Sequence, residues 1–450
     1  MPDPKYQALY DEVDKLLSEL NLGDAAQRLQ DNPSDQGTML LAKGMLEEAV
    51  FAYKELARLP EGGNYNNYAF LYGHLQAQIQ RYEQLAVKSE SDFGRKKILI
   101  SIPVWGNEYI RAMIAVLLPT LLAPENLPKL SAAYDVIIEF AMRASDIASF
   151  VQTGVYENLL GMSNVEVVTA SFPDEIFASA SEIHGFAYRI MGGMHHLAIH
   201  RARSLGGAHV IFLGSDFILS DGLLANAIAH AEDGFDLVLS APMKVSKNKI
   251  VPFLLDDANN QENREHLSIM ARRLVDHGIR AMHPESQQLI VSTRTKPFSR
   301  APFPLYFPSG NGYSVRSFMF HPLVLSAQLS LQDIMYDYNT VDGVLLDRAL
   351  LGRSPESVIK VMSNSDDGVF FDVGEDRTVK ESEVIDEFSL PAVIEWLYNW
   401  RKTGVEEVYR WLLAQRVRYR SGEELVVCHE GDYAEDMVVG ILSHTLEKLN

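Results

Sequence analysis

Residues 210–222 read Val-Ile-Phe-Leu-Gly-Ser-Asp-Phe-Ile-Leu-Ser-Asp-Gly, an apolar run that ends in two aspartates. The run predicts a buried strand over His209–Leu213, and the residues after it predict a helix over Leu223–Ala231. A carboxylate at such a junction either caps the helix or binds something else. We expect Asp221 to be the cap, because it stands just before the helix. Asp216 is then the candidate for another role.

Similar apolar runs recur through the middle of the chain, and helical patterns separate them. Strands are expected over Lys97–Pro103, Asp135–Ala141, Val165–Ala170, His209–Leu213 and Asp236–Ala241. Helices are expected between them, including Tyr109–Leu122 and Ser181–Leu205. Strands that are apolar throughout and alternate with helices predict an α/β fold, with a mostly parallel sheet covered on both faces. Ligands of such sheets bind beyond the carboxyl ends of the strands, where Asp216 lies.

Composition narrows the range of functions. The chain has 60 acidic and 40 basic residues and a formal net charge of −20, which disfavours a nucleic-acid partner. Its single cysteine, Cys428, permits no internal disulfide, and its acidic amino terminus lacks the pattern of a signal peptide, so we expect a cytoplasmic protein. The longest apolar stretch, Ala112–Ala123, is shorter than the ~20 residues that cross a bilayer, so we expect no membrane span.

The loop after the first strand carries no phosphate-binding fingerprint. Neither G-x-G-x-x-G nor G-x-x-x-x-G-K-[ST] follows that strand, and G-x-S-x-G is absent, which disfavours a Rossmann dehydrogenase, a P-loop enzyme and a serine hydrolase. The loop instead reads Pro103-Val104-Trp105-Gly106. These residues suit contact with the flat ring of a base or sugar, and a place for Trp105 in the core is the alternative.

Three segments together resemble a known family. The first strand with its loop, Ile98–Gly106, the turn Ser215–Phe217 and the later Ser317–Pro322 are similar to segments of GT-A fold glycosyltransferases, enzymes that use nucleotide-sugar donors. The resemblance covers roughly Lys96–Ser363. It implies a GT-A-like, Rossmann-like catalytic domain over residues 93–363.

The resemblance also implies a donor site. Ser215 and Asp216 would contact the donor diphosphate, with Asp216 binding a divalent cation, Mn²⁺ or Mg²⁺, and His321 completing the metal shell. A hard cation held by carboxylates neutralises charge as the sugar leaves. This chain has Gly214 where the family commonly has the first aspartate of Asp-x-Asp, so binding of the phosphates by Arg and Lys side chains without metal is an alternative. A plain turn-forming role for Asp216 is another.

Position in the resembled fold assigns donor contacts to Pro103, Val104, Trp105, Asp146, Tyr188 and His196. A helix cap would explain Asp146 equally well, and a packing role would explain Tyr188. His196 is alternatively a hydrogen-bonded interior histidine. Zinc binding by His196 and His200, which share a helix face, is disfavoured because no third ligand is near in the sequence.

Inverting transfer also needs a base that takes the proton of the acceptor hydroxyl. We expect Asp342 to be this catalytic base, with Asp337 as its competitor, and retaining transfer would need neither in that role. The glycine-rich segment Phe307–Gly312 either turns beneath the acceptor or is a plain loop. Ser363–Gly368 is expected to be a solvated acidic turn.

Two regions lie outside the resemblance. Residues 1–92 have helical periodicity, and Gly44–Pro60 resembles the second half of a tetratricopeptide repeat, with an ordinary amphipathic helix as the alternative. We expect this region to be an interaction or homo-oligomerisation module. Residues 364–450 are expected to form a helical carboxyl-terminal extension.

The function expected from these residues is transfer of a sugar from a nucleoside diphosphate sugar, a UDP- or GDP-sugar first of all, to a hydroxyl acceptor on a glycan, protein or small molecule. A sugar nucleotidyltransferase is a second interpretation, although such enzymes usually carry a glycine-rich basic loop after the first strand. A non-catalytic nucleotide-sugar-binding protein of the same fold is a third.

Overall fold

The computed structural model describes residues 65–86, 94–178, 186–261, 266–291, 304–317, 320–327, 353–375, 406–422 and 431–448. Three predictions fall outside these ranges: the tetratricopeptide-like segment Gly44–Pro60 and the two candidate bases, Asp337 and Asp342.

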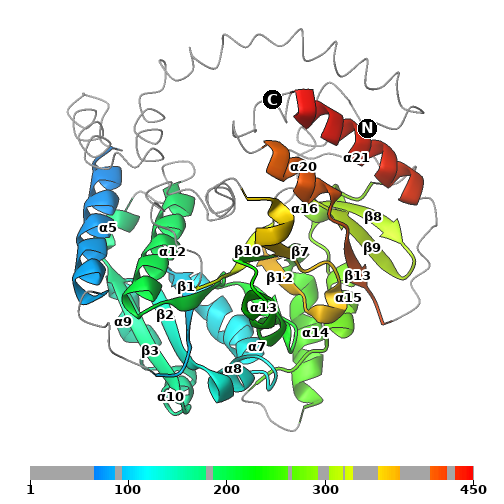
Figure 1. The fold of residues 1–450 in the computed structure, drawn as a ribbon. Coiled ribbons are helices and arrows are strands. Elements are labelled where there is room, and N and C mark those ends of the chain that lie inside the picture. The colour runs from blue at the N-terminus through cyan, green and yellow to red at the C-terminus, as the bar shows by residue number, and fades with distance from the viewer. Residues whose placement is uncertain are drawn as a thin grey trace.

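The described residues form a mixed α/β fold around a seven-stranded sheet (Figure 1). In spatial order its strands are β11 (Ile359–Val361), β6 (Leu237–Ser240), β10 (His321–Leu325), β4 (Ala208–Phe212), β1 (Lys97–Val104), β2 (Asp135–Arg143) and β3 (Val165–Phe172). β10 alone among these is antiparallel to both of its neighbours. All five strands predicted from apolar runs are present, so the predicted fold class, a mostly parallel sheet flanked by helices, is confirmed.

Successive side chains of the central strands are buried on opposite faces, as the pleat of a strand requires. Leu99 and Val210 lie in one core, which α12 (Phe186–Ser204) covers. Ile100 and Ile211 lie in the other core. That second core is covered by α6 (Asn107–Ala112), the π-helical η3 (Met113–Leu117), α7 (Leu118–Leu121), α8 (Leu127–Ala133) and α13 (Leu223–Glu232). Helices on both faces therefore account for the continuous apolar runs.

The described part of the amino-terminal region is one helix, α5 (Tyr65–Ala86), which confirms helix there. Its Leu71 and Leu75 share a core with Ile190 and Met194 of α12, so α5 forms an outer layer of the α/β fold (Figure 1). Three short helices continue from β2 and β3: α9 (Ala144–Phe150), α10 (Gly154–Leu160) and α11 (Asp174–Phe177). Within the described ranges, none of the helices has the length and apolar character needed to cross a membrane.

Two smaller sheets extend the fold. The first contains β5 (Phe217–Leu219), β12 (Phe370–Gly374) and β7 (Met243–Ser246), with β12 in the middle. The second contains β13 (Val417–Arg420), β9 (Gly312–Arg316) and β8 (Leu305–Ser309). The region 364–450, predicted to be helical, thus supplies two strands as well as helices, because β12 and β13 complete sheets begun by earlier parts of the chain. Phe307–Gly312 is the end of the β8–β9 hairpin.

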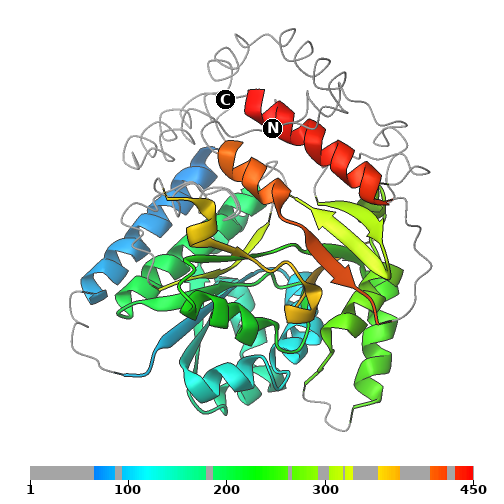
Figure 2. The ribbon, with the colours of Figure 1, turned by 45° about the vertical axis from the view of Figure 1, so that its right-hand side comes forward.

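Helices surround these two sheets. They are α14 (Lys247–Asn259), α15 (Ala271–Arg280), α16 (Pro284–Gln287), α18 (Pro355–Val358), the 3₁₀ helix η4 (Ser365–Asp367), α20 (Glu406–Ala414) and α21 (Gly431–Lys448). α20 and α21 lie side by side next to the sheet of β8, β9 and β13 (Figure 2). The buried carboxylate of Glu435 on α21 accepts hydrogen bonds from Ser314 of β9, at 2.9 Å, and from Arg416, also at 2.9 Å.

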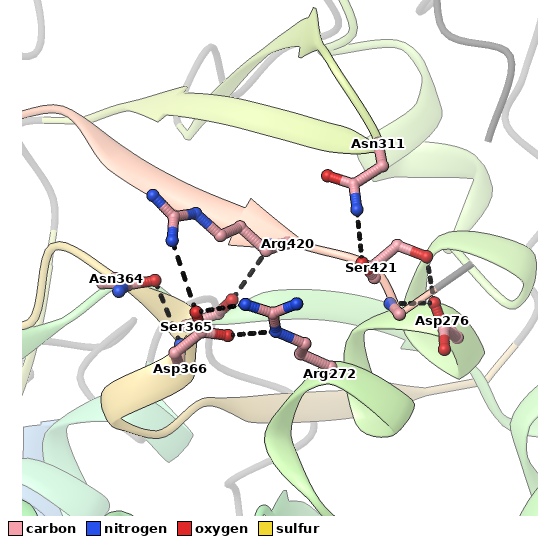
Figure 3. A network of polar contacts seen from close by, with 9 residues as sticks. Arg272, Asp276, Asn311, Asn364, Ser365, Asp366, Arg420 and Ser421 are labelled. Atoms are coloured by element: carbon pink, nitrogen blue, oxygen red, sulfur yellow. Dashed lines mark hydrogen bonds and ion pairs between the residues drawn. The ribbon is translucent and has the colours of Figure 1, made fainter. Parts of the chain in front are cut away.

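A polar network joins the carboxyl-terminal strand β13 to the rest of the fold (Figure 3). Arg272 on α15 donates two hydrogen bonds to Asp366, at 2.8 and 2.9 Å, and Arg420 on β13 contacts the same carboxylate at 3.4 Å. Gly422 N donates to Asp276 at 3.0 Å. Hydrogen bonds from Arg272 are the main cause that lowers the pKa of Asp366. The predicted solvated turn Ser363–Gly368 is therefore solvated only in part, because Asp367 is exposed whereas Asp366 is partly buried and ion-paired.

We expect Asp366→Asn to lower the free energy of unfolding by about 1 kcal/mol at about pH 7, since it removes a bidentate ion pair that solvent partly screens. A lowered pKa means that this contribution exists above the ordinary pKa of a carboxyl group and is lost as pH falls through the folded-state value. Urea unfolding should therefore show a smaller difference at about pH 3. The exposed neighbour Asp367→Asn is the control, and an equal loss there would contradict the role given to Asp366.

Candidate active site

The carboxyl ends of β1 and β4 adjoin where the order of strands reverses. From β1 the chain runs outward through β2 and β3, whereas β4 lies on the opposite side of β1. The crevice outside such a switch point is the usual ligand site of an open α/β sheet. Trp105 directly follows β1, and Asp216 lies in the short turn between β4 and β5. Two predicted donor residues therefore flank the switch point.

Asp216 meets a second carboxyl group, that of Asp372 on β12. Strand pairing brings them together, because Asp372 lies opposite Phe217 and Val373 N donates to Asp216 O at 3.1 Å. The two carboxyl groups lie close enough for each to affect the pKa of the other. Burial raises the pKa of Asp216 to about 7, and the charge of Asp372 adds to the effect. Burial also raises the pKa of Asp372, so the pair retains one proton into the neutral range.

Lys244 and His283 lie near this carboxyl pair. Lys244 on β7 lies beside Asp372 in register, and its charge lowers the pKa of both carboxyl groups. Its Nζ donates to Glu285 Oε2 at 2.7 Å. His283 is fully buried, and its Nε2 lies 2.9 Å from Glu375 O. Lys244 is thus a cation close enough to the pair to assist the binding of an anion.

His321, the predicted metal ligand, lies in the same place. It begins β10, and its Nε2 is 2.8 Å from the carbonyl oxygen of Phe212, the last residue of β4. Its ring packs edge-on against Phe217 and Phe370, at 5.2 and 5.3 Å between ring centroids. With Nε2–H donating to the carbonyl, Nδ1 is the acceptor nitrogen, which is how metal-binding histidines are commonly oriented. The structure therefore brings Asp216 and His321 into one site.

The residues of this site fit a divalent cation that the substrate helps to bind. Within the described ranges, no group of three or more His, Cys, Asp or Glu side chains is arranged to hold a metal by itself. Two carboxylates, Asp216 and Asp372, suit Mg²⁺ or Mn²⁺, which are often bound by one or two carboxylates together with substrate phosphates. A cation would also favour the charged forms of both groups, which burial disfavours. Metal binding itself stays a prediction.

Asp372 was not among the site residues predicted from the sequence. It stands in Val369-Phe370-Phe371-Asp372-Val373, where an acidic residue interrupts an apolar strand. Such an interruption is a signal that a strand brings a charge to a site. Its partner could not be found from the sequence, because the contact depends on β12 pairing between β5 and β7.

The residues predicted around β1 have mixed outcomes. Pro103 and Val104 belong to the strand itself and are buried, Val104 in the second core. Trp105 is partly buried, with its ring 5.4 Å from that of Phe177 on α11. Packing of Trp105 is thus shown, while contact of these residues with a donor stays a prediction.

Asp221, which was expected to cap a helix, and Asp146, a predicted donor contact with a helix cap as the alternative, do not cap helices, and contact of Asp146 with a donor stays a prediction. Asp146 is buried and accepts hydrogen bonds from Gly106 N at 2.8 Å and from Arg143 at 2.6 Å. It therefore holds the loop that carries Trp105. Asp221 accepts hydrogen bonds from Glu125 N at 2.8 Å and from Ser268 Oγ at 2.6 Å. No side chain caps α13, because its N-cap residue is Gly222, which has no side chain and a left-handed φ of 90°.

The predicted residues of α12 lie in different surroundings. His196 is buried and Tyr188 is 62% exposed, so they do not face one common pocket. His195 is next to His196 in the sequence and is also buried. Its Nδ1 lies 3.1 Å from Ser101 Oγ of β1, and its ring packs edge-on against Phe212. Burial holds the pKa of His195 well below its usual range, so this histidine is neutral. Ser215 is buried next to Asp216.

A cleft of about 600 Å³ lies elsewhere, between α5, the edge strand β3 and α12. It is lined by residues that include His74, Arg81, Tyr82, Phe172 and Arg201. None of the predicted donor or metal residues lines it. The cleft is therefore separate from the carboxyl pair.

Comparison with models of known protein families and with curated proteins finds no match. Among solved structures the chain is similar to that of S. aureus TarS, a glycosyltransferase, with 12% sequence identity and a TM-score of 0.28. The similarity covers 71% of this chain but 43% of that protein, so the chain matches less than half of its length. A TM-score of 0.28 carries no functional argument, and function has to be argued from the site itself.

The raised pKa of Asp216 predicts an unusual pH dependence. The folded chain keeps a proton that the unfolded chain releases above about pH 4, so the free energy of unfolding falls as pH rises towards about pH 7. Asp216→Asn removes the charge, and its stability relative to wild type should increase by on the order of 2 kcal/mol between about pH 5 and pH 8. Denaturant unfolding measures this. The exposed Asp233→Asn should show no such change. A difference in unfolding free energy between Asp216→Asn and wild type that stays constant with pH would contradict the raised pKa of Asp216.

Proposed function

We propose that this chain is a glycosyltransferase that moves a sugar from a nucleoside diphosphate sugar to a hydroxyl acceptor. The observation that carries the proposal is the carboxyl pair of Asp216 and Asp372 beside Lys244, at the switch point of a mostly parallel sheet. Raised carboxyl pKa values in a crevice are typical of functional sites. An ion pair that only stabilises the fold joins groups of opposite charge, whereas Asp216 and Asp372 are both acidic.

The chemistry of glycosyl transfer gives each of these groups a role. The diphosphate gains negative charge as the bond to the sugar breaks, and stabilising that charge accelerates the reaction. A Mn²⁺ or Mg²⁺ ion, when bound, would supply most of this neutralisation. Asp216 and Asp372 would hold it in their charged forms. Lys244 would face the diphosphate directly, and His321, the predicted metal ligand, would lie beside the carboxyl pair.

The loop after β1 would position the nucleotide. Trp105 presents a flat ring at the carboxyl end of β1, and the hydrogen bond from Gly106 N to Asp146 fixes the backbone of this loop. A fixed loop lowers the entropic cost of binding a base or sugar against it. In this arrangement Asp146 acts on the donor through the loop.

The remaining features of the proposal come from the sequence. Asp342, or else Asp337, would take the acceptor proton, and UDP- and GDP-sugars are the first donors to test. The acceptor would be a hydroxyl of a glycan, a protein or a small molecule. A cytoplasmic location and an amino-terminal interaction or oligomerisation module belong to the same proposal.

Donor hydrolysis and transfer, assayed with UDP- and GDP-sugars with and without acceptors, test the function. Asp216→Asn and Asp372→Asn should each lower turnover by about a hundredfold or more, because each removes charge that stabilises the leaving group. Asp233→Asn, at an exposed position, should keep wild-type turnover.

Three results would count against parts of the proposal. Activity that EDTA leaves untouched would exclude the metal. Full activity in both Asp216→Asn and Asp372→Asn would exclude the site. Binding of nucleotide sugars without any turnover would favour a non-catalytic binding protein.

A further inference from the structure

The cleft between α5, β3 and α12 has the size and the walls of a small-molecule site. Its volume of about 600 Å³ lies within the range of ~300–1,000 Å³ that is usual for ligand pockets. Its walls include Val168 and Phe172 of β3 and Leu197 of α12, and α5 adds the ring of Tyr82. A largely apolar and aromatic lining with a few polar groups is typical of sites for small organic ligands.

His74 of α5 brings to this cleft a polar atom that lacks a hydrogen-bond partner. Its Nε2 is buried and makes no hydrogen bond to any residue that the structure describes. Its ring centroid lies 4.8 Å from that of Phe172. Burial lowers the pKa of His74, so the imidazole is neutral near pH 7 and can carry its proton on either nitrogen. An unpaired buried polar atom costs free energy, and a ligand group bonded to it removes that cost.

Two arginines give the cleft its charge. Arg81 of α5 and Arg201 of α12 both line it, and none of its described lining residues is acidic. Burial raises the pKa of Tyr82 to about 12, Glu139 adds to this shift, and Arg201 and Arg81 oppose it. Both guanidinium groups therefore lie near the phenol of Tyr82. In a chain with a net charge of −20, such a cleft favours an anionic ligand.

The charge of Arg201 is already balanced by the protein. Its Nη1 lies 2.6 Å from Oε2 of Glu139, whose side chain is 1% exposed. Its Nη2 is 3.9 Å from Oε1 of Glu166, which is 66% exposed and therefore screened by water. This balance leaves Arg81 as the main positive charge that the lining presents. One carboxylate suits it better than a phosphate monoester, which carries nearly two charges.

The spacing of the polar groups on α5 sets the length of a suitable ligand. His74 and Arg81 are seven residues apart, so they share one face of the helix and are separated by about 10 Å along its axis. Both of them line the cleft. A rigid ligand that meets both residues therefore has polar groups at opposite ends of a flat body, which two fused aromatic rings provide.

We infer that this cleft binds an elongated aromatic carboxylate with a hydroxyl at its far end, at a site separate from the carboxyl pair. The aromatic body packs against Phe172 and Leu197. The carboxylate pairs with Arg81, and the hydroxyl bonds to Nε2 of His74. Because a hydroxyl both donates and accepts, it suits either tautomer of the imidazole. The inference goes beyond the proposed function and does not depend on it.

Titration of the full-length chain with 6-hydroxy-2-naphthoate, followed by ligand-observed NMR, tests this inference. The probe should bind wild type with a Kd of about 1 mM or lower, as expected for a ligand of this size. Arg81→Gln should weaken binding about tenfold, and 2-naphthol, which lacks the carboxylate, should bind wild type about tenfold more weakly than the probe. Arg81→Gln should bind both compounds equally, since the contact that distinguishes them is gone. Arg111→Gln, at an exposed position of α6, is the matched control and should change Kd by less than about twofold.

A second pair of measurements tests the hydrogen bond to His74. 2-Naphthoate, which lacks the hydroxyl, should bind wild type about fivefold more weakly than the probe. His74→Phe keeps a ring beside Phe172 and removes the nitrogen, so it should bind the two compounds equally. Thermal unfolding of the free His74→Phe variant should show no loss of stability, because the substitution removes an unpaired buried polar atom.

Three results would overturn the inference. The first is that 6-hydroxy-2-naphthoate does not bind wild type. The second is that folded Arg81→Gln or His74→Phe still distinguishes the compounds as wild type does. The third is that Lys244→Met weakens binding as strongly as Arg81→Gln, because the probe then binds at the carboxyl pair. None of these results bears on the proposed function, which is tested with nucleotide sugars.

Discussion

The contact between Asp216 and Asp372 is the constraint on which the site depends. Two buried carboxyl groups repel each other once both are charged, and the backbone holds them together. Here that backbone is the small sheet in which β12 pairs with both β5 and β7. The turn after β4 carries one carboxyl group into this sheet, and β12 brings the other from the carboxyl-terminal part of the described chain. Buried carboxyl groups with raised pKa values are typical of functional sites.

The loop after β1, which carries Trp105, is also held by contacts with distant segments of the chain. The backbone of this loop is held by the hydrogen bond from Gly106 N to Asp146, which is buried. Two residues further along the chain, Glu108 makes an exposed contact with Lys247.

Local patterns predicted the central sheet well because each strand is buried on both faces and so reads as an apolar run. The same patterns placed Asp216 at a strand end, and the fold brought His321 to it. Contacts between distant segments could not be predicted in this way. Asp372 reaches Asp216 only through strand pairing, and Asp221 has Glu125 and Ser268 as partners in place of a helix terminus. The acidic turn at Asp366 looked solvated because its arginine partners, Arg272 and Arg420, are far away in sequence.

A crystal structure of the chain with a nucleoside diphosphate and Mn²⁺ tests most directly whether the carboxyl pair is the donor site. The anomalous signal of manganese should lie between the carboxylates of Asp216 and Asp372, with the diphosphate on the same ion and the base beside the loop of Trp105. A diphosphate bound elsewhere, for example in the cleft between α5 and α12, with no manganese between Asp216 and Asp372, would contradict this assignment.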